Sequence, residues 1–594
     1  RALARMNVIL HDCPTAEIVQ GNTLSSPQFK DEKTGALKTF DFVVANPPFS
    51  MKAWTSGFHP EDDDRFRLGV PPEKNGDYAF LLHVISSLKS TGKGAIILPH
   101  GVLFRGHAEA DIRRAIVERG YLKGIIGLPA NLFYGTGIPA CILVLDKEGA
   151  AGRRGIFMVD ASKGFVKDGN KNRLRAQDIH KIVDVFTRQV EVPRYSRMVP
   201  LAEISDPKNN FNLNLPRYID SSEPEDIQDI DAHLRGGLPN RDLDALDRYW
   251  QVFPGVRAAL FKRADRAGYS QLRVAVVDIK TTIFGHAEFT AWSGEVTKLF
   301  AGWREKTAKK LRGIAKGDKP KALIEDLSED LLAAFEKAPL VDAYDVYQHL
   351  MDYWAETMQD DVYLLVSEGF REAAKPRLLV EDKEKKVKEK PDFTVGKQKY
   401  KAELIPPSVL VARYFASEKA VIEAHEAECA VISQAMEELA EEHGGEDGLL
   451  EEVKTEKGKI NKGLVAARLK VIKGDRGAAD ERKVLSEYLA LCEKEAATSA
   501  KAKAAEEALN EKLAAKYGKL TEDEIKALVV EDKWLAAVEA SVQAEVDRVS
   551  HTLTGRIREL AERYATPLPQ LTKEVETLAA RVDAHLKKMG AVWC

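Results

Sequence analysis

The most constraining feature of this sequence is the segment Asn46-Pro47-Pro48-Phe49, which directly follows the apolar run 40–45. A short apolar run of this kind predicts a buried parallel strand, and the segment then lies at the carboxyl end of that strand, where α/β sheets bind ligands. Proline fixes its own backbone angle and drives the preceding residue toward an extended conformation. The two prolines therefore predict a rigid bend at the edge of a sheet.

The residue types in this bend suit a planar amine. The side-chain carbonyl of Asn46 and the main-chain carbonyl of Pro47 can accept both hydrogens of an exocyclic amino group, which exposes the lone pair of its nitrogen. Phe49 offers a face on which a base can stack. The segment therefore predicts chemistry in which the nitrogen of the substrate is the nucleophile. The alternative is that these four residues form only a tight turn after a strand.

Length and charge limit the function. A chain of 594 residues predicts about three or four domains. The net charge of −4 differs from that of basic DNA-binding domains, so any DNA must be held by a local groove or by a partner subunit. The five cysteines have no disulfide or metal spacing, which indicates a reducing cytoplasm and argues against a metal site. No apolar run is long enough to span a membrane.

Residues 1 to about 160 alternate strand and helix patterns, which predicts a doubly wound α/β sheet, and we expect the first domain to span 1–225. The first residues have the pattern of a helix. Gly135-Thr136-Gly137 suggests a phosphate-binding loop, but it lacks a third glycine and a following helix, so a plain turn is expected. The expected helices are 77–90 and 111–118, and the further expected strands are 95–99, 124–128 and 141–145.

The rest of the chain predicts a long, mostly helical region. We expect a helical domain at 226–375, a linker at 376–405 that contains the highly charged run 381–390, and coiled-coil-like helices at 406–594. Several aromatic residues of the helical region suit a helix-packing core, and base stacking is the alternative. These aromatic residues are Tyr249, Trp250, Trp303, Tyr344, Tyr347 and Tyr353.

Two apolar stripes of equal spacing follow each other near the carboxyl end, separated by Pro567 and Pro569. Such a pair predicts an antiparallel helical hairpin whose seam is buried internally or docks on a partner protein. The first stripe consists of Val542, Val546, Val549, Leu553, Ile557 and Leu560, and the second of Leu571, Val575, Leu578, Val582, Leu586 and Met589.

From residue 1 to about residue 218 the sequence resembles the second half of the catalytic core of the modification subunits of type I restriction-modification systems, which are N6-adenine DNA methyltransferases. Residues 240–540 match only loosely, and the stretch 564–590 resembles the end of longer members. The matching blocks are Ala4-Arg5-Met6-Asn7 with His11, Gly21-Asn22-Thr23-Leu24, 42–49, 76–80, 98–106, 111–113, Leu128-Pro129, Phe133-Tyr134 and 214–218.

The resemblance implies S-adenosylmethionine as the cofactor and a flipped adenine held by Asn46, Pro47, Pro48 and Phe49. It places Asn22 against the adenine ring of the cofactor, although a turn or helix cap explains Asn22 equally well. Asp77 and Tyr78 are expected at the same sheet edge, where they shape the pocket, unless Asp77 only begins a helix. The implied partners are DNA, a specificity subunit and, in complete systems, a restriction (nuclease) subunit.

One departure from the family pattern is expected to matter. The glycine-rich cofactor loop and the acidic residue that holds the ribose belong upstream of Arg1, so the chain is expected to be a fragment that binds the cofactor poorly and does not methylate DNA unaided. Two alternatives stay open. The chain is a non-catalytic scaffold that keeps the fold, or a methyltransferase that acts on RNA or on a glutamine amide of a protein.

Overall fold

The computed structural model describes residues 2–222, 225–379, 389–445, 448–455, 458–475 and 477–590. The chain falls into two compact units, one formed by Arg1–Arg235 with Pro567–Cys594 and the other by Gly236–Thr566. Most of the charged run 381–390 lies outside the described residues. The predicted division into four domains stays a prediction.

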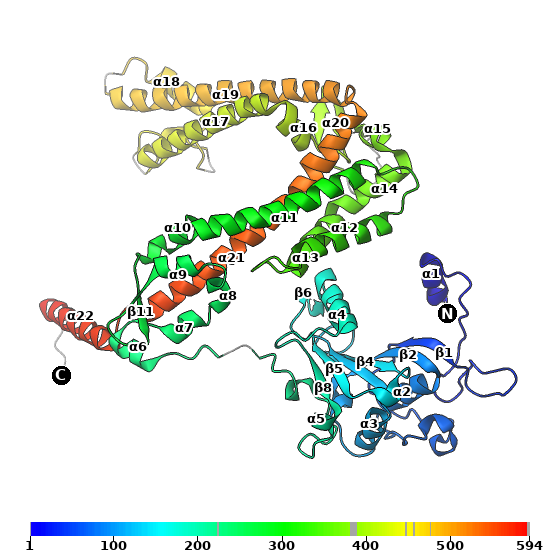
Figure 1. The fold of residues 1–594 in the computed structure, drawn as a ribbon. Helices are drawn as coiled ribbons and strands as arrows, with labels where there is room; N and C mark the ends of the chain where they lie inside the picture. Colours follow the sequence, from blue (N-terminus) through cyan, green and yellow to red (C-terminus); the bar gives the residue numbers. More distant parts are fainter. Residues whose placement is uncertain are drawn as a thin grey trace. The chain divides into compact units, whose positions relative to one another are not determined.

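The first unit is built on a six-stranded mixed sheet in the order β1-β2-β4-β3-β5-β8 (Figure 1). Strand β1 is parallel to β2 and β3 is parallel to β5, whereas β4 and β8 are antiparallel to their neighbours. The strands are β1 (Phe40–Ala45), β2 (Leu88–Pro99), β3 (Leu122–Gly127), β4 (Ala140–Asp146), β5 (Gly155–Asp160) and β8 (Ser196–Pro200).

Helices cover both faces of this sheet because its central strands are apolar on both sides. Ile125 and Met158 pack toward α2 and α3, whereas Ile126 and Phe157 pack toward α4. The predicted α/β core is therefore confirmed. The helices of this unit are α1 (Ala2–Leu10), α2 (Asp77–Ser86), α3 (Ala108–Glu118), α4 (Ala176–Arg188), α5 (Leu201–Ser205), α6 (Ile230–Arg235) and α22 (Leu568–Lys588), and a hairpin is formed by β6 (Val166–Asp168) and β7 (Lys171–Arg173).

The prediction of a buried strand at 40–45 was wrong in one respect. Strand β1 is parallel to β2 as expected, but it is the edge of the sheet. Val43 and Ala45 pack on the face that α2 covers, while Phe42 and Val44 are 76% and 82% exposed. An apolar run specifies a strand, but it does not specify how many neighbours the strand has.

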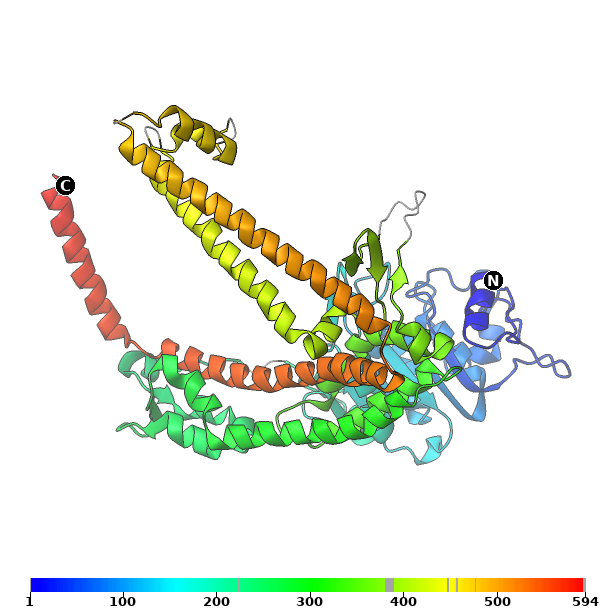
Figure 2. The ribbon, with the colours of Figure 1, turned by 90° about the horizontal axis from the view of Figure 1, so that it is seen from above.

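The second unit is mainly helical, as the sequence predicted. The long helices α17 and α19 lie side by side (Figure 2). Tyr249, Trp250, Trp303 and Tyr347 are buried between helices, which confirms the helix-packing role of these aromatic residues. The main helices are α9 (Pro254–Leu260), α10 (Ile279–Phe284), α11 (Ala287–Arg312), α12 (Pro320–Phe335), α13 (Ala343–Tyr353), α14 (Gln359–Glu368), α16 (Pro407–Tyr414), α17 (Ala416–His443), α18 (Lys462–Val471), α19 (Ala479–Tyr517) and α21 (Ala536–Arg563).

Two small antiparallel sheets complete the second unit. One has the order β10-β11-β9 and the other the order β12-β14-β13. The second sheet flanks the charged run, so part of the predicted linker 376–405 is folded. The strands are β9 (Leu238–Pro239), β10 (Phe261–Arg263), β11 (Tyr269–Leu272), β12 (Arg377–Leu378), β13 (Phe393–Val395) and β14 (Gln398–Lys401).

The predicted hairpin of the two carboxyl-terminal stripes stays a prediction, because their helices belong to different units. The stripe of α21 is buried, for example at Val546 and Ile557, and it packs against α10, α11 and α13 of its own unit. Helix α22 buries none of its side chains, and Val575 of its stripe is 64% exposed. Equal spacing gave both helices an apolar face, but other helices already cover the first face.

Candidate functional site

Asn46 lies where strand β1 ends, in the irregular segment that the two prolines impose. Its side chain is exposed, and it makes no hydrogen bond to any residue that the structure describes. Pro47 is buried beneath it, which anchors the bend to the sheet. The Asn46 amide is therefore open to a substrate, as the amine-holding interpretation requires.

Phe49 meets a second aromatic ring that the sequence did not assign to the site. The rings of Phe49 and Phe133 are 5.7 Å apart at an interplanar angle of 74°, an edge-to-face contact. Phe133 comes from the loop between β3 and β4, and Lys171 of β7 fixes this loop by donating to the carbonyls of Phe133 at 2.8 Å and Thr136 at 3.0 Å. Tyr134 beside it is 95% exposed. This loop includes the glycines at 135 and 137, so they do serve a turn.

Asp77 and Tyr78 begin α2, and only the first touches the bend. The carboxylate of Asp77 accepts from the backbone N–H of Ser50 at 2.6 Å. The hydroxyl of Tyr78 donates to the carbonyl of Val102 at 2.7 Å, and its burial raises the pKa of that phenol above its ordinary value. Tyr78 is thus a core residue, whereas Asp77 is in direct contact with the residue that follows Phe49.

Asn22 serves a turn in this structure. Its side-chain oxygen accepts from the backbone N–H groups of Leu24 at 3.0 Å and Ser25 at 3.2 Å, the pattern of an Asx turn. Arg65 links this turn to α2, because it donates to the carbonyl of Leu24 at 2.6 Å and lies 3.0 Å from Nδ1 of His83. The side chain of Asn22 is exposed, and its role toward a cofactor stays a prediction.

Arg65 also determines which ring nitrogen of His83, on α2, carries the proton, and it lowers the pKa of this histidine. Its guanidinium lies 3.0 Å from Nδ1 of His83, and because arginine can only donate, Nδ1 of His83 accepts and the ring proton sits on Nε2. Burial, and next the charge of Arg65, lower the pKa of His83 to about 4. The hydrogen bond from Arg65 also holds the pKa of Asp63 below its ordinary value.

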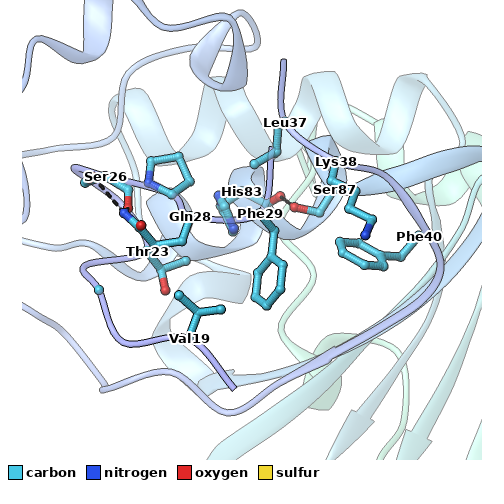
Figure 3. A pocket seen from close by; sticks show the side chains of 12 residues that line it. Val19, Thr23, Ser26, Gln28, Phe29, Leu37, Lys38, Phe40, His83 and Ser87 are labelled. Carbon is cyan, nitrogen blue, oxygen red and sulfur yellow. Dashed lines mark hydrogen bonds between the residues drawn. The ribbon is translucent and has the colours of Figure 1, made fainter. Parts of the chain in front are cut away.

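A cavity of about 90 Å³ opens between the 19–40 segment and α2 (Figure 3). Its lining includes Phe29, Phe40, His83 and Ser87, but none of the residues Asn46–Phe49. Sites for drug-sized ligands usually measure about 300–1,000 Å³. The cavity is therefore too small for a nucleoside cofactor.

The described part of the chain contains no group of residues arranged to hold a metal ion. Cys13, Cys141, Cys429 and Cys492 are free thiols. None of the described helices combines the length and apolar character that crossing a bilayer requires.

Residues 1–227 match the family model described as N-6 DNA Methylase. The methylase subunit of the type I restriction enzyme MjaVII of Methanocaldococcus jannaschii is 35% identical over 273 residues, which are 43% of this chain and 45% of that relative. The methylase subunit of MpnII of Mycoplasma pneumoniae is 32% identical over 236 residues, 38% of this chain and 43% of that relative.

Among solved structures, a methyltransferase subunit of a type I restriction-modification system from Streptococcus thermophilus is 39% identical, with a TM-score of 0.34, and the match covers 37% of this chain and 46% of that one. The chain spans less than half the length of the curated relatives that it matches.

Residues 1–227 therefore belong to the N-6 DNA methylase family. The relatives that share this region are methylase subunits of type I restriction enzymes, so the resemblance stated from the sequence is confirmed.

Proposed function

We propose that this chain is part of a type I modification subunit that transfers a methyl group from S-adenosylmethionine to N6 of a flipped adenine in DNA. The observation that carries the proposal is the exposed, unbonded side chain of Asn46 at the end of β1, inside the region that belongs to the N-6 DNA methylase family. Because the Asn46 side chain makes no hydrogen bond to any described residue, its oxygen is free to accept one from a substrate amine.

In this proposal the Asn46–Phe49 bend holds the exocyclic amino group of adenine. The Asn46 side-chain oxygen and the Pro47 carbonyl accept the two amino hydrogens of adenine, and Phe49 supports the ring. Flipping a base out of the duplex costs a few kcal/mol, which these contacts help to offset. Because the methyl group is already activated when the cofactor is bound, the rate depends mainly on how well the nitrogen is positioned.

The residues described here do not form a complete site for S-adenosylmethionine. Asn22 uses its oxygen within its own turn, and the neighbouring cavity of about 90 Å³ is too small for the cofactor. We therefore assign no step of cofactor binding to named residues. For the same reason we expect residues 1–594 alone to bind the cofactor weakly and to methylate DNA poorly.

The proposed partners follow from the same family. With a net charge of −4, the chain needs another source of DNA affinity, and a specificity subunit would supply it together with the choice of sequence. A restriction (nuclease) subunit is the further proposed partner. The free thiols agree with a reducing cytoplasm as the place of action.

The test uses the native subunit purified from its host together with its specificity subunit. The complex is incubated with radiolabelled S-adenosylmethionine and unmethylated DNA, and the modified nucleoside is identified by mass spectrometry. We expect N6-methyladenine, and we expect Asn46→Ala to lower kcat by about 100- to 1,000-fold, the usual effect of losing one hydrogen bond to a reacting group.

Asn510→Ala is the matched control, because it makes the same change on α19 of the other unit. Label found in protein or RNA instead of DNA would favour the other acceptors. Absence of any label, or equal rates for the wild type and Asn46→Ala, would refute the proposal and favour a scaffold.

A further inference from the structure

The bend that carries Asn46 continues into strained backbone. Ser50 and Ala53 both have a φ of 50°, which is the left-handed region. A residue with a side chain adopts this conformation only at a cost in free energy, so the conformation persists only where the surroundings hold it. The position of Phe49 is therefore set by whatever fixes Ser50.

The start of α2 supplies that fixation. The backbone N–H of Ser50 donates to Oδ1 of Asp77 at 2.6 Å, and the backbone N–H of Gly76 donates to the carbonyl of Met51 at 2.9 Å. A Cβ on Gly76 would lie 3.1 Å from Cβ of Trp54, so the two segments are already in close contact. Residues 50–54 and the first turn of α2 are thus attached at several points.

Asp77 is fully buried, and its charge is balanced by one cation. Nη1 of Arg105, from the loop after β2, donates to Oδ2 of Asp77 at 2.8 Å. The amide of Asn75, turned with its nitrogen toward the carboxylate, donates to the same oxygen at 2.7 Å and accepts from Arg105. Both oxygens of Asp77 are therefore occupied by donors.

A second carboxyl group lies farther from Arg105 than that of Asp77 does. Oε1 of Glu109 is 3.6 Å from Arg105, and the other oxygen of Glu109 has no partner among the described residues. Burial raises the pKa of Glu109 above its ordinary value, which favours the neutral acid. Of the two carboxyl groups, that of Asp77 is the nearer to Arg105, at 2.8 Å.

We propose that Asp77 is a positioning residue for the transfer reaction: through the Ser50 N–H it holds the Asn46–Phe49 bend in the conformation that presents Asn46 to the amine, and Arg105 holds Asp77. The inference rests on the proposed function. A carboxylate is required because one oxygen accepts from Ser50 while the other faces the donors of Arg105 and Asn75. An asparagine would direct its NH2 group against one of these donors.

The experiment compares Asp77→Asn, Arg105→Gln and the conservative Arg105→Lys in the native complex with its specificity subunit and DNA. Asp146→Asn is the matched control, because Asp146 is also buried and forms an ion pair, with Lys123 at 3.3 Å. Asp146 is the last residue of β4, where β4 pairs with Lys93 of β2. For each protein, kcat and KM are measured, together with hydrogen exchange of peptides that cover residues 49–53 and residues 80–86.

We expect Asp77→Asn and Arg105→Gln to lower kcat by about 10- to 100-fold, because small displacements of reacting groups have effects of this size. KM for the methyl donor should change by less than about 2-fold, and Arg105→Lys should recover part of kcat, since a cation again faces Asp77. Amides 49–53 should exchange faster, whereas amides 80–86 should exchange as in the wild type.

Two results would overturn the inference. One is a kcat for Asp77→Asn no lower than that of Asp146→Asn, and the other is unchanged exchange of amides 49–53. Should Asp77→Asn fail to fold, the same comparisons apply to Arg105→Gln, whose parent side chain is 30% exposed. A wild-type complex without methyl transfer would refute the proposed function, while the exchange measurement would still decide whether Asp77 holds the bend.

Discussion

Protonation of His83 should make the first unit lose stability in mild acid. In the folded chain burial and Arg65 lower the pKa of His83 to about 4, from an ordinary value of 6.5. Between these values the unfolded chain binds a proton that the folded chain excludes. The stabilising effect is therefore complete above pH 6.5 and is lost progressively as the pH falls toward 4.

The size of this effect follows from the shift. One pKa unit corresponds to about 1.4 kcal/mol, so the full shift is worth at most about 3 kcal/mol at pH 4, and up to about 2 kcal/mol at pH 5. The physical cost is first that of burying a charged imidazole ring, and next that of placing a second cation 3.0 Å from Arg65.

The assay is unfolding in urea at about pH 7.5 and at about pH 5. Unfolding is detected by pulsed hydrogen exchange of the peptide that covers α2, so that the signal belongs to the first unit. His83→Gln keeps an acceptor for Arg65 but cannot be protonated. We expect the wild type to lose about 2 kcal/mol more than this variant between the two pH values. The control is His59→Gln, the same change at an exposed position of the same unit.

The reasoning would be refuted if the wild type and His83→Gln lost the same free energy of unfolding between the two pH values. A larger loss in the variant would also contradict it, because it would mean that His83 binds a proton more readily in the folded chain than in the unfolded one.

Two other side chains give separate predictions. Lys533→Ala should lower the unfolding free energy of the second unit by about 3–5 kcal/mol. The reason is that the buried carboxylate of Asp361, 2.6 Å from Lys533, loses its cation. An unchanged urea midpoint would contradict this prediction. Tyr134→Ala should leave the melting temperature unchanged, since Tyr134 is 95% exposed. If a DNA base stacks on the Tyr134 ring, the same change should weaken DNA binding of the native complex by about 1–3 kcal/mol. Equal affinity of the variant and the wild type in a filter-binding titration would exclude this stacking contact.

The sequence determined the local parts of the site. An apolar run followed by Asn46 and two prolines specifies a strand that ends in a bend, and Asn46 is exposed in that bend. The alternation of strand and helix patterns specified the α/β core, because residue periodicity fixes which side chains share a face. The family also followed from sequence, because its motifs are short and lie in a fixed order.

Tertiary structure alone decided which faces meet. Periodicity gave α21 and α22 equal stripes, yet only the stripe of α21 is covered, because a stripe encodes an apolar face and not its partner. The edge position of β1 was equally hidden from the sequence. Ser50 and Asp77 are 27 residues apart, and Phe49 meets Phe133 from another loop. Such contacts depend on how strands are ordered in the sheet, which no local pattern specifies.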